Sequence, residues 1–206
     1  MREKSFFADE ARRRTTQAIQ AVEAQTSAEV VVAVRRRSGS YAVAAYHCGL
    51  AALLLVTLYL LVTPRVVSIE AIALDGLLAF FLGALVSANV DTLLRVVTRH
   101  KTRQAHVDIT ARAAFFDLGI SRTKGRNGIL IFISTFERTL TVLTDVGIDA
   151  QALGIQWAQS HAALREALSR MDFAEFIAGV EALGPVLGAA MARAADDVNE
   201  LPDEVQ

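Results

Sequence analysis

The sequence predicts a mixed α/β protein, a small αβα sandwich, that is interrupted by a two-helix transmembrane hairpin. Two observations predict it. Residues 29–34 and 129–134 are short apolar runs bounded by polar residues, as is typical of strands buried on both faces, and amphipathic segments flank them. Between these runs lie two long apolar stretches, at residues 38–64 and about 71–94, and about 20 apolar residues suffice to cross a bilayer as a helix.

The chain opens with an amphipathic helix that leads to the first strand. Ser5 is available as its N-cap, and Asp9 and Glu10 fall in the first turn, where acidic residues are typical. Its apolar positions recur at helical spacing: Phe7, Ala11, Ala18 and Val22. The strand 29–34 follows and leads directly to the first apolar stretch.

The two apolar stretches differ in how clearly they predict a membrane span. Residues 38–64 contain no charged side chain, whereas Glu70, Asp75 and Asp91 bracket the apolar core of the second stretch. The alternative is that both are buried helices of a soluble protein, as apolar runs of about 10–14 residues commonly are. Gly83 and Ser87 form a small-x-x-x-small pair that allows close helix packing, either within the hairpin or with another copy.

The loops around the spans predict an orientation. The short linker, residues 63–70, carries a single basic residue, Arg65, and suits a tight hairpin. Basic residues gather on the other side of both spans: Arg35, Arg36, Arg37, Arg95, Arg99, Lys101 and Arg103. By the positive-inside rule both flanks and both termini are cytoplasmic. The same clusters can bind anionic lipid head groups, at about 1 kcal/mol per basic residue.

Composition agrees with a soluble domain that carries a membrane anchor. Hydrophobic residues make up 53% of the chain and charged residues 21%, and the net charge of −1 gives no overall attraction to nucleic acid. The single cysteine, Cys48, excludes an intramolecular disulfide, and the N-terminus shows no apolar region of a cleavable signal. We therefore divide the chain into four segments: 1–37 and 98–195 as the two parts of a cytoplasmic domain, 38–97 as the hairpin, and 196–206 as a disordered acidic tail.

The second half supplies the rest of the domain. Residues 103–118 form a predicted helix that Gly119 terminates, and the strand 129–134 follows a turn-rich loop. Residues 140–143 complete a β-hairpin. Two helices close the fold, at residues 156–168 and 173–195, the latter interrupted at Gly184 and Pro185. Because Glu175 and Glu181 punctuate the last helix, we do not expect it to be a third span.

Several of these segments together resemble the TPM domain family, and more narrowly its bacterial membrane-anchored branch. The most specific part is Asn127-Gly128, a strand, Glu137-Arg138, a second strand, and Asp145-x-Gly147-Ile148; residues 29–34, Tyr41 and residues 114–120 add to it. The similarity covers residues 6 to about 187, outside the spans. It implies a four-stranded αβα sandwich at the bacterial inner membrane. Functions attached to family members include photosystem repair and phosphatase activity in plant thylakoids, calcium binding, and receptor modulation in animals.

Asp145 is the candidate metal ligand. It follows the last strand, and α/β proteins place ligands at the end of a sheet. A carboxylate there could ligate Ca²⁺, with Asp149 or Asp117 contributing oxygens, although the chain has no dense acidic loop. The alternative is that Asp145 caps the following turn by accepting hydrogen bonds from backbone amides.

The loop 122–128 is the candidate anion site. Three cations and two glycines let side chains and backbone amides converge on a phosphate, either of a substrate or of a lipid head group. The spacing is not that of a P-loop, and the alternative is a solvated turn. The residues proposed to bind the anion are Arg122, Lys124, Arg126 and Asn127.

The sequence favours a binding or membrane-protein quality-control module that acts on the lipid bilayer or on a membrane-protein partner. The alternative is a metal-dependent phosphatase at the cytoplasmic membrane face, with Asp117, Asp145 and Thr123 as candidates for its nucleophile or metal-bound water. Whether the chain is an enzyme is left open, since no zinc-binding histidine spacing, nucleophile elbow or dinucleotide fingerprint is present. Two helices without paired intramembrane charges argue against a transporter.

Overall fold

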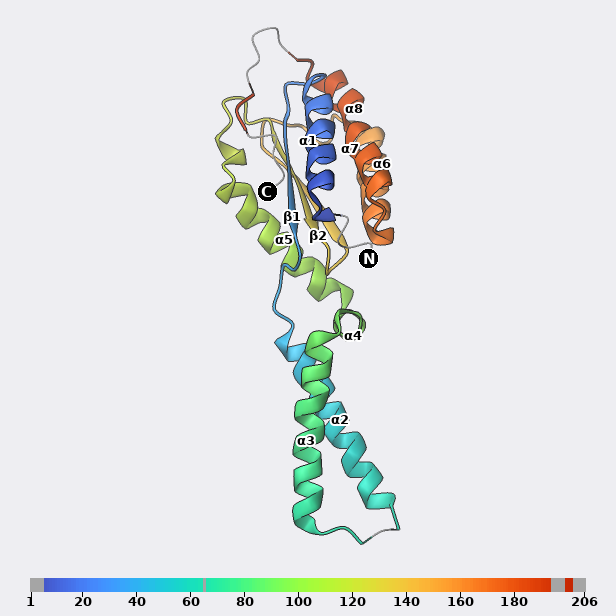
Figure 1. Cartoon of the computed structure of the whole chain (residues 1–206). Coiled ribbons are helices and arrows are strands. Elements are labelled where there is room, and N and C mark those ends of the chain that lie inside the picture. The colour runs from blue at the N-terminus through green and yellow to red at the C-terminus, as the bar shows by residue number, and fades with distance from the viewer. Residues whose placement is uncertain (1–5, 65, 194–198, 202–206) are drawn as a thin grey trace. The chain divides into compact units, whose positions relative to one another are not determined.

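The computed structural model describes residues 6–64, 66–193 and 199–201. The chain forms two compact units (Figure 1). One consists of Met1–Ser38 and Gln104–Gln206 and contains the β-sheet; we call it the sheet unit. The other, Gly39–Arg103, is the hairpin unit.

The sheet has three strands: β1 (Glu29–Arg35), β2 (Gly128–Ser134) and β3 (Thr139–Thr144). Their order is β1-β2-β3, with β1 parallel to β2 and β3 antiparallel to β2. The predicted strands and the predicted β-hairpin of β2 and β3 are confirmed, and the fold is mixed α/β. The described residues form one strand fewer than the four implied by the family resemblance.

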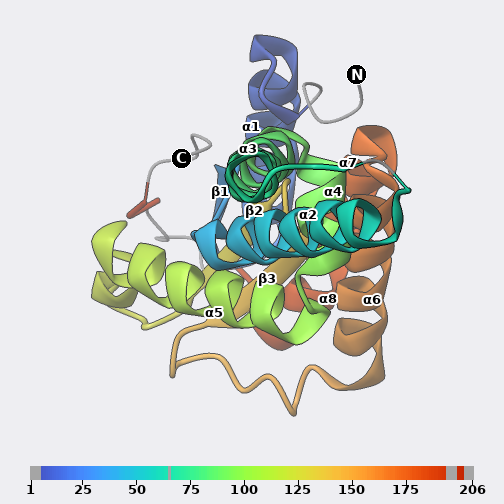
Figure 2. The same ribbon diagram turned by 90° about the horizontal axis from the view of Figure 1, so that it is seen from below.

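Helices cover both faces of the sheet. Figures 1 and 2 show α5 (His100–Asp117) on one side of the strands and α6 (Gly154–Arg170) with α8 (Leu183–Ala190) on the other, where α1 (Asp9–Glu23) and α7 (Phe173–Glu181) also pack. Alternate residues of β2 serve the two cores: Ile131 joins the cluster of α1 and α6, and Leu130 and Phe132 join that of α5. All three are fully buried, as predicted for a strand buried on both faces.

Helix α1 begins later than the sequence predicts. The expected N-cap, Ser5, lies outside the described residues, and Ala8 precedes the helix without a side-chain cap. Phe6, rather than the expected Phe7, enters the core, where its ring packs edge-on against Phe173 at a centroid distance of 5.3 Å.

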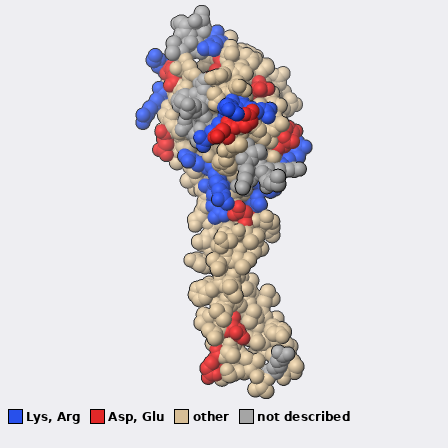
Figure 3. Space-filling view, in the orientation of Figure 1, with Lys and Arg blue, Asp and Glu red and all other residues tan. Residues whose placement is uncertain are grey.

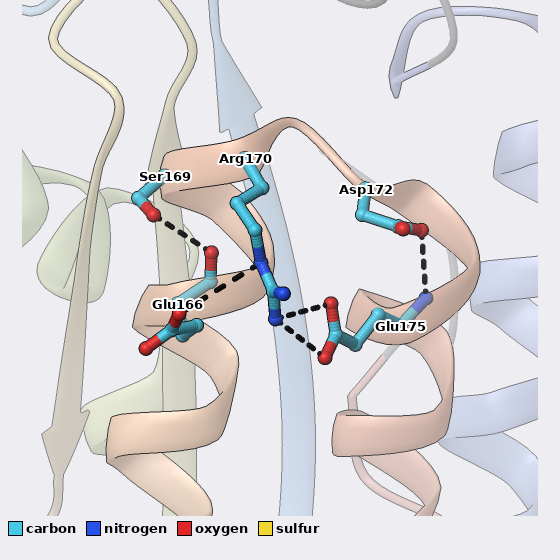
Figure 4. Close-up of polar contacts among 5 residues, drawn as sticks. All are labelled: Glu166, Ser169, Arg170, Asp172 and Glu175. Atoms are coloured by element: carbon cyan, nitrogen blue, oxygen red, sulfur yellow. Dashed lines mark hydrogen bonds and ion pairs between the residues drawn. The ribbon is translucent and has the colours of Figure 1, made fainter.

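A compact joint links α6 to α7 (Figure 4). Met171 ends α6 in the left-handed conformation, with φ of 55°, and the Asp172 side chain caps α7 by accepting a hydrogen bond from the Glu175 amide at 3.1 Å. Arg170 donates to both carboxylate oxygens of Glu175 at 2.7 Å. The break between α7 and α8 falls at Ala182 rather than at Gly184 and Pro185, because proline is tolerated in the first turn of a helix.

The hairpin unit pairs α2 (Ala42–Val62) with α3 (Ile69–Asn89), and the short helix α4 (Asp91–Val97) follows. Small residues bring the two long helices together. A Cβ added at Gly83 would lie 2.7 Å from the Ala52 Cβ, and one at Gly49 would lie 2.6 Å from the Phe80 carbonyl oxygen. Since Ser87 also faces α2, with its Oγ 3.5 Å from the Ala45 carbonyl, the small-residue pair serves packing within the hairpin.

Three helical segments among the described residues are long and apolar enough to cross a membrane, where the sequence predicted two: Ala42–Val62, Ile69–Asn89 and Phe173–Ala190. The third segment corresponds to α7 and α8. It is 39% buried over its most apolar window, against 11% and 6% for the other two, because Phe176, Val180 and Leu187 lie in the core of the sheet unit. Packing in the core of the sheet unit therefore accounts for the apolar residues of this segment.

We predict that acidification destabilises the sheet unit through His161. This histidine packs on Trp157 at a centroid distance of 4.2 Å, and burial, with a smaller effect of Arg165, lowers its pKa from 6.5 to about 4. The unfolded chain then takes up a proton below pH 6.5 while the folded chain does not. The contribution of the neutral His161 to stability is therefore fully present above pH 6.5 and is lost as the pH drops to 4; because solvent partly screens the ring, we expect a loss on the order of 2 kcal/mol.

Melting curves of the purified chain between pH 7 and pH 4 measure this effect. The His161→Gln variant should lose less stability over that range than the wild type. Equal pH dependence of the two proteins would contradict the assignment to His161.

Candidate functional site

The structure brings the loop 122–127 and Asp145 together at one end of the sheet. The Asp145 amide donates to the Gly128 carbonyl at 2.9 Å, and the Gly147 amide donates to the Arg126 carbonyl at 2.8 Å. This end is the amino-terminal end of β1 and β2, because β3 runs antiparallel to them. Asp145 thus lies at an end of the sheet, as expected, but α/β proteins place ligands at the carboxyl ends of parallel strands, which is the opposite end.

Asp145 is held by Arg126. The Arg126 Nη2 donates to Asp145 Oδ1 at 3.0 Å, and its Nε lies 2.9 Å from Oδ2. The Val146 amide also donates to Oδ1, at 2.8 Å, so Asp145 caps the turn that follows it, as the alternative interpretation predicted. The carboxylate side chain is only 3% exposed, and a buried carboxylate needs such a partner.

Gly147 allows the two loops to touch. A Cβ at this position would lie 2.4 Å from the Gly125 carbonyl oxygen and 2.5 Å from that of Arg126, closer than any side chain permits. Only glycine lets the Asp145 turn pack directly on the backbone of the candidate anion loop.

Asn127 ties the same loop to β1. Its Nδ2 donates to the Ser27 carbonyl, its amide donates to Thr123 Oγ1 at 3.2 Å, and its carbonyl accepts from the Glu29 amide at 3.2 Å. Of the four predicted anion ligands, Asn127 and Arg126 thus make structural contacts within the domain. Arg122 and Lys124 are exposed, and neither side chain forms an ion pair with any residue that the structure describes.

The C-terminal tail reaches this loop. The Lys124 amide donates to the Glu200 carboxylate at 3.0 Å, and the buried carboxylate of Glu29 accepts from the amides of Glu200 and Leu201 at 3.2 and 3.3 Å. The prediction of a disordered tail does not hold for residues 199–201. The other residues of the tail, 196–198 and 202–206, lie outside the described residues.

The residues proposed for calcium do not fit a calcium site. Both oxygens of Asp145 face Arg126, while Asp149 Oδ1 caps the next turn by accepting from the amides of Gln151 and Ala152 at 2.9 and 3.2 Å. Within the described ranges, no group of three or more His, Cys, Asp or Glu side chains is placed to hold a metal ion. Ca²⁺ requires six to eight oxygen ligands. A calcium titration that raised the melting temperature would restore the proposal.

The carboxyl ends of β1 and β2 carry a partly buried polar cluster that the sequence did not single out as a site. The Glu137 carboxylate, in the turn between β2 and β3, accepts from the Ser38 amide at 3.0 Å and from the Ser134 hydroxyl. The Ser38 hydroxyl donates to Ser134 Oγ at 2.9 Å, and Thr110 Oγ1 donates to the Ser38 carbonyl at 3.0 Å. We call these four residues the exit clamp, because Ser38 is the last residue of the sheet unit before the chain enters the hairpin unit.

Backbone pairing of the two parallel strands continues past their ends as far as the exit clamp. The amides of Thr135 and Phe136 donate to the carbonyls of Arg35 and Arg36 at 3.0 and 2.9 Å, and the Arg37 guanidinium lies 4.2 Å from the centre of the Phe136 ring. Glu137 is 2% exposed. The one sequence signal for this residue was its place in the segment that resembles the TPM family.

Comparison with known proteins gives a fold but no family. No protein-family model matches the chain, and no curated protein matches it by sequence. The chain is similar to a solved structure, the NMR structure of BA42 protein from the psychrophilic bacteria Bizionia argentinensis sp. nov., with a TM-score of 0.56 and 17% sequence identity. The match covers 96% of this chain and 92% of that chain. At this identity the likeness shows the fold alone.

We predict that Asp145 is needed for stability. Replacement of Asp145 by Ala leaves Arg126 without its partner and the Val146 amide without its cap, and should lower the free energy of unfolding by about 2–4 kcal/mol. Asp117→Ala, at an exposed carboxylate on the last residue of α5, is the matched control and should change it by less than about 0.5 kcal/mol. Chemical denaturation measures both, and equal stability of the two variants would refute a structural role for Asp145.

Proposed function

We propose that the chain is a membrane-anchored binding module, in which the hairpin unit spans the membrane and the sheet unit is a cytoplasmic domain. The observation that carries this proposal is the apolar exterior of α2 and α3. Each helix has 21 residues, or about 31 Å at 1.5 Å per residue, which matches a hydrocarbon core of about 30 Å. Their mean hydropathy over 18 residues is 2.0 and 2.1.

The outward side chains of the hairpin unit support a lipid environment. Leu55, Leu61 and Phe81 are 68%, 72% and 64% exposed, and they belong to a larger set of exposed leucine, valine and aromatic residues on both helices. Soluble proteins rarely expose so continuous an apolar surface. In Figure 3 no lysine or arginine lies on the visible face of α2 and α3. The third apolar segment, α7 with α8, packs in the core and supports a topology of two spans.

The charges beside the hairpin unit support an orientation with both termini in the cytoplasm. Arg35, Arg36 and Arg37 precede it, and Arg95, Arg99, Lys101 and Arg103 follow α3. Loops rich in lysine and arginine remain cytoplasmic. Arg65, the basic residue of the linker, lies outside the described residues. Anionic lipid head groups are a natural partner for these basic residues.

The resemblance to the TPM family supports placement at a bacterial inner membrane. The residues that carry this resemblance have structural tasks here: Asn127 joins the loop to Ser27, Glu137 holds Ser38, and Asp145 holds Arg126. The shared motif therefore supports a shared fold more than a shared reaction.

Binding is a better fit than phosphate-ester hydrolysis. Of the three residues considered for catalysis, two are inaccessible: Thr123 is 3% exposed and accepts a hydrogen bond from Asn127, and Asp145 is occupied by Arg126. Asp117 alone is exposed. A nucleophile must reach its substrate. Arg122 and Lys124, in contrast, are exposed cations of the same loop as the Lys124 backbone amide, so we propose them as the site for an anion. A ligand bound there would lie in the cytoplasm, and a membrane-protein partner remains part of the proposal.

We predict a topology of two spans that single-cysteine labelling can test. Cys48→Ala removes the one native cysteine. In this background Val66→Cys places a single thiol in the linker, and Gln156→Cys, in a separate variant, places a single thiol at an exposed position of α6. In intact spheroplasts a membrane-impermeant maleimide should label the Val66→Cys chain, and the Gln156→Cys chain only after lysis. The protein should also stay with the membranes in alkaline carbonate.

Two results would contradict this proposal. One is labelling of Gln156→Cys in intact spheroplasts, which would place the sheet unit outside. The other is release of the chain by carbonate, which would make the hairpin unit part of a soluble assembly.

A further inference from the structure

The candidate anion loop already holds an anion, and this anion belongs to the chain itself. The Lys124 amide donates to the Glu200 carboxylate at 3.0 Å, across 76 residues of sequence. A backbone amide next to exposed cations is a common way to bind a negatively charged group. Glu200 therefore marks the position on this loop where an anion is bound.

Glu200 reaches the loop because the backbone of residues 200 and 201 is hydrogen-bonded to β1. The carboxylate of Glu29, the first residue of β1, accepts from the amides of Glu200 and Leu201 at 3.2 and 3.3 Å. The Leu201 side chain packs on the apolar cluster beneath α5. The Glu29 amide donates to the Asn127 carbonyl, so the same residue supports both the loop and the tail.

Glu200 fills the site only in part. Its carboxylate accepts from the Lys124 amide, but it forms no ion pair with Arg122 or Lys124 within the described ranges. A phosphate dianion carries more charge and more acceptor oxygens than a carboxylate. It could accept from the amide while pairing with both cations, and the planar guanidinium of Arg122 suits two phosphate oxygens at once.

We propose that Glu200 is a built-in competitor of a phosphate ligand. In the free protein the Glu200 carboxylate occupies the Lys124 amide, and a phosphate group binds by taking the place of that carboxylate. This inference rests on the proposed anion site at Arg122 and Lys124 and adds its regulation. The ligand class is a phosphate dianion, whether free or at the end of a lipid head group.

Calorimetric titration of the full chain with inorganic phosphate tests the proposal, in phosphatidylcholine nanodiscs at pH 7.5. The Glu200→Gln variant removes the competing charge and should bind phosphate at least fivefold more tightly than the wild type. Glu181→Gln makes the same change at an exposed carboxylate of α7 and should bind like the wild type. The double variant Arg122→Ala, Lys124→Ala should bind at least tenfold more weakly.

The outcomes separate this inference from the anion site on which it rests. Equal phosphate affinity of wild type and Glu200→Gln, both weakened by loss of Arg122 and Lys124, would overturn the competition and leave the site in place. No binding of phosphate by any variant would overturn both. An equal gain in Glu181→Gln would show a general charge effect and would also overturn the competition.

A second arm identifies the source of the phosphate group. The titration is repeated in nanodiscs that contain phosphatidic acid, with phosphatidylserine nanodiscs as the control for surface charge. If a lipid phosphate occupies the loop, phosphatidic acid should weaken the binding of inorganic phosphate to Glu200→Gln at least fivefold more than phosphatidylserine does. Equal effects of the two lipids would assign the site to a soluble phosphate.

Discussion

The hydrogen bond from the Ser38 amide to the buried Glu137 carboxylate fixes the point at which the chain leaves the sheet unit. The segment that connects the parallel strands β1 and β2 contains the whole hairpin unit. Pairing the two strands closes this long loop, and contacts at the strand ends must offset the loss of chain entropy. The exit clamp supplies them, since Thr110 and Ser134 hold the same residue.

The opposite end of the strands is closed by a different set of contacts. There Asn127 holds Ser27, and Arg126 holds Asp145 where the turns of Gly125 and Gly147 touch. These residues build the frame and leave the loop's remaining cations, Arg122 and Lys124, facing solvent. At one end of the sheet the chain thus leaves toward the hairpin unit, and the other end carries the loop that we propose as an anion site.

The sequence predicted the elements of the fold better than their contacts. Apolar periodicity is local, and it located both long apolar helices, the strands and the close packing of Gly83. The cations and glycines of the loop 122–128, and the position of Asp145 after the last strand, made both of them functional candidates. The pairing of Arg126 with Asp145 was not predicted, although the predicted β-hairpin already returns the end of β3, where Asp145 lies, to the start of β2, where Arg126 lies. The burial of Glu137 could not be predicted from the local sequence, since it depends on contact with Ser38, 99 positions earlier.

Hydrogen exchange tests the exit clamp most directly. In the full chain in nanodiscs, Glu137→Ala removes the buried acceptor of the Ser38 amide, and an amide that loses its partner costs about 1–3 kcal/mol, so the segment 35–38 should exchange at least tenfold faster than in the wild type. The first residues of β1, which are held from the other end by Asn127, should keep their protection. Unchanged exchange at residues 35–38 in Glu137→Ala would contradict the account, because the chain would then leave the sheet unit without this anchor.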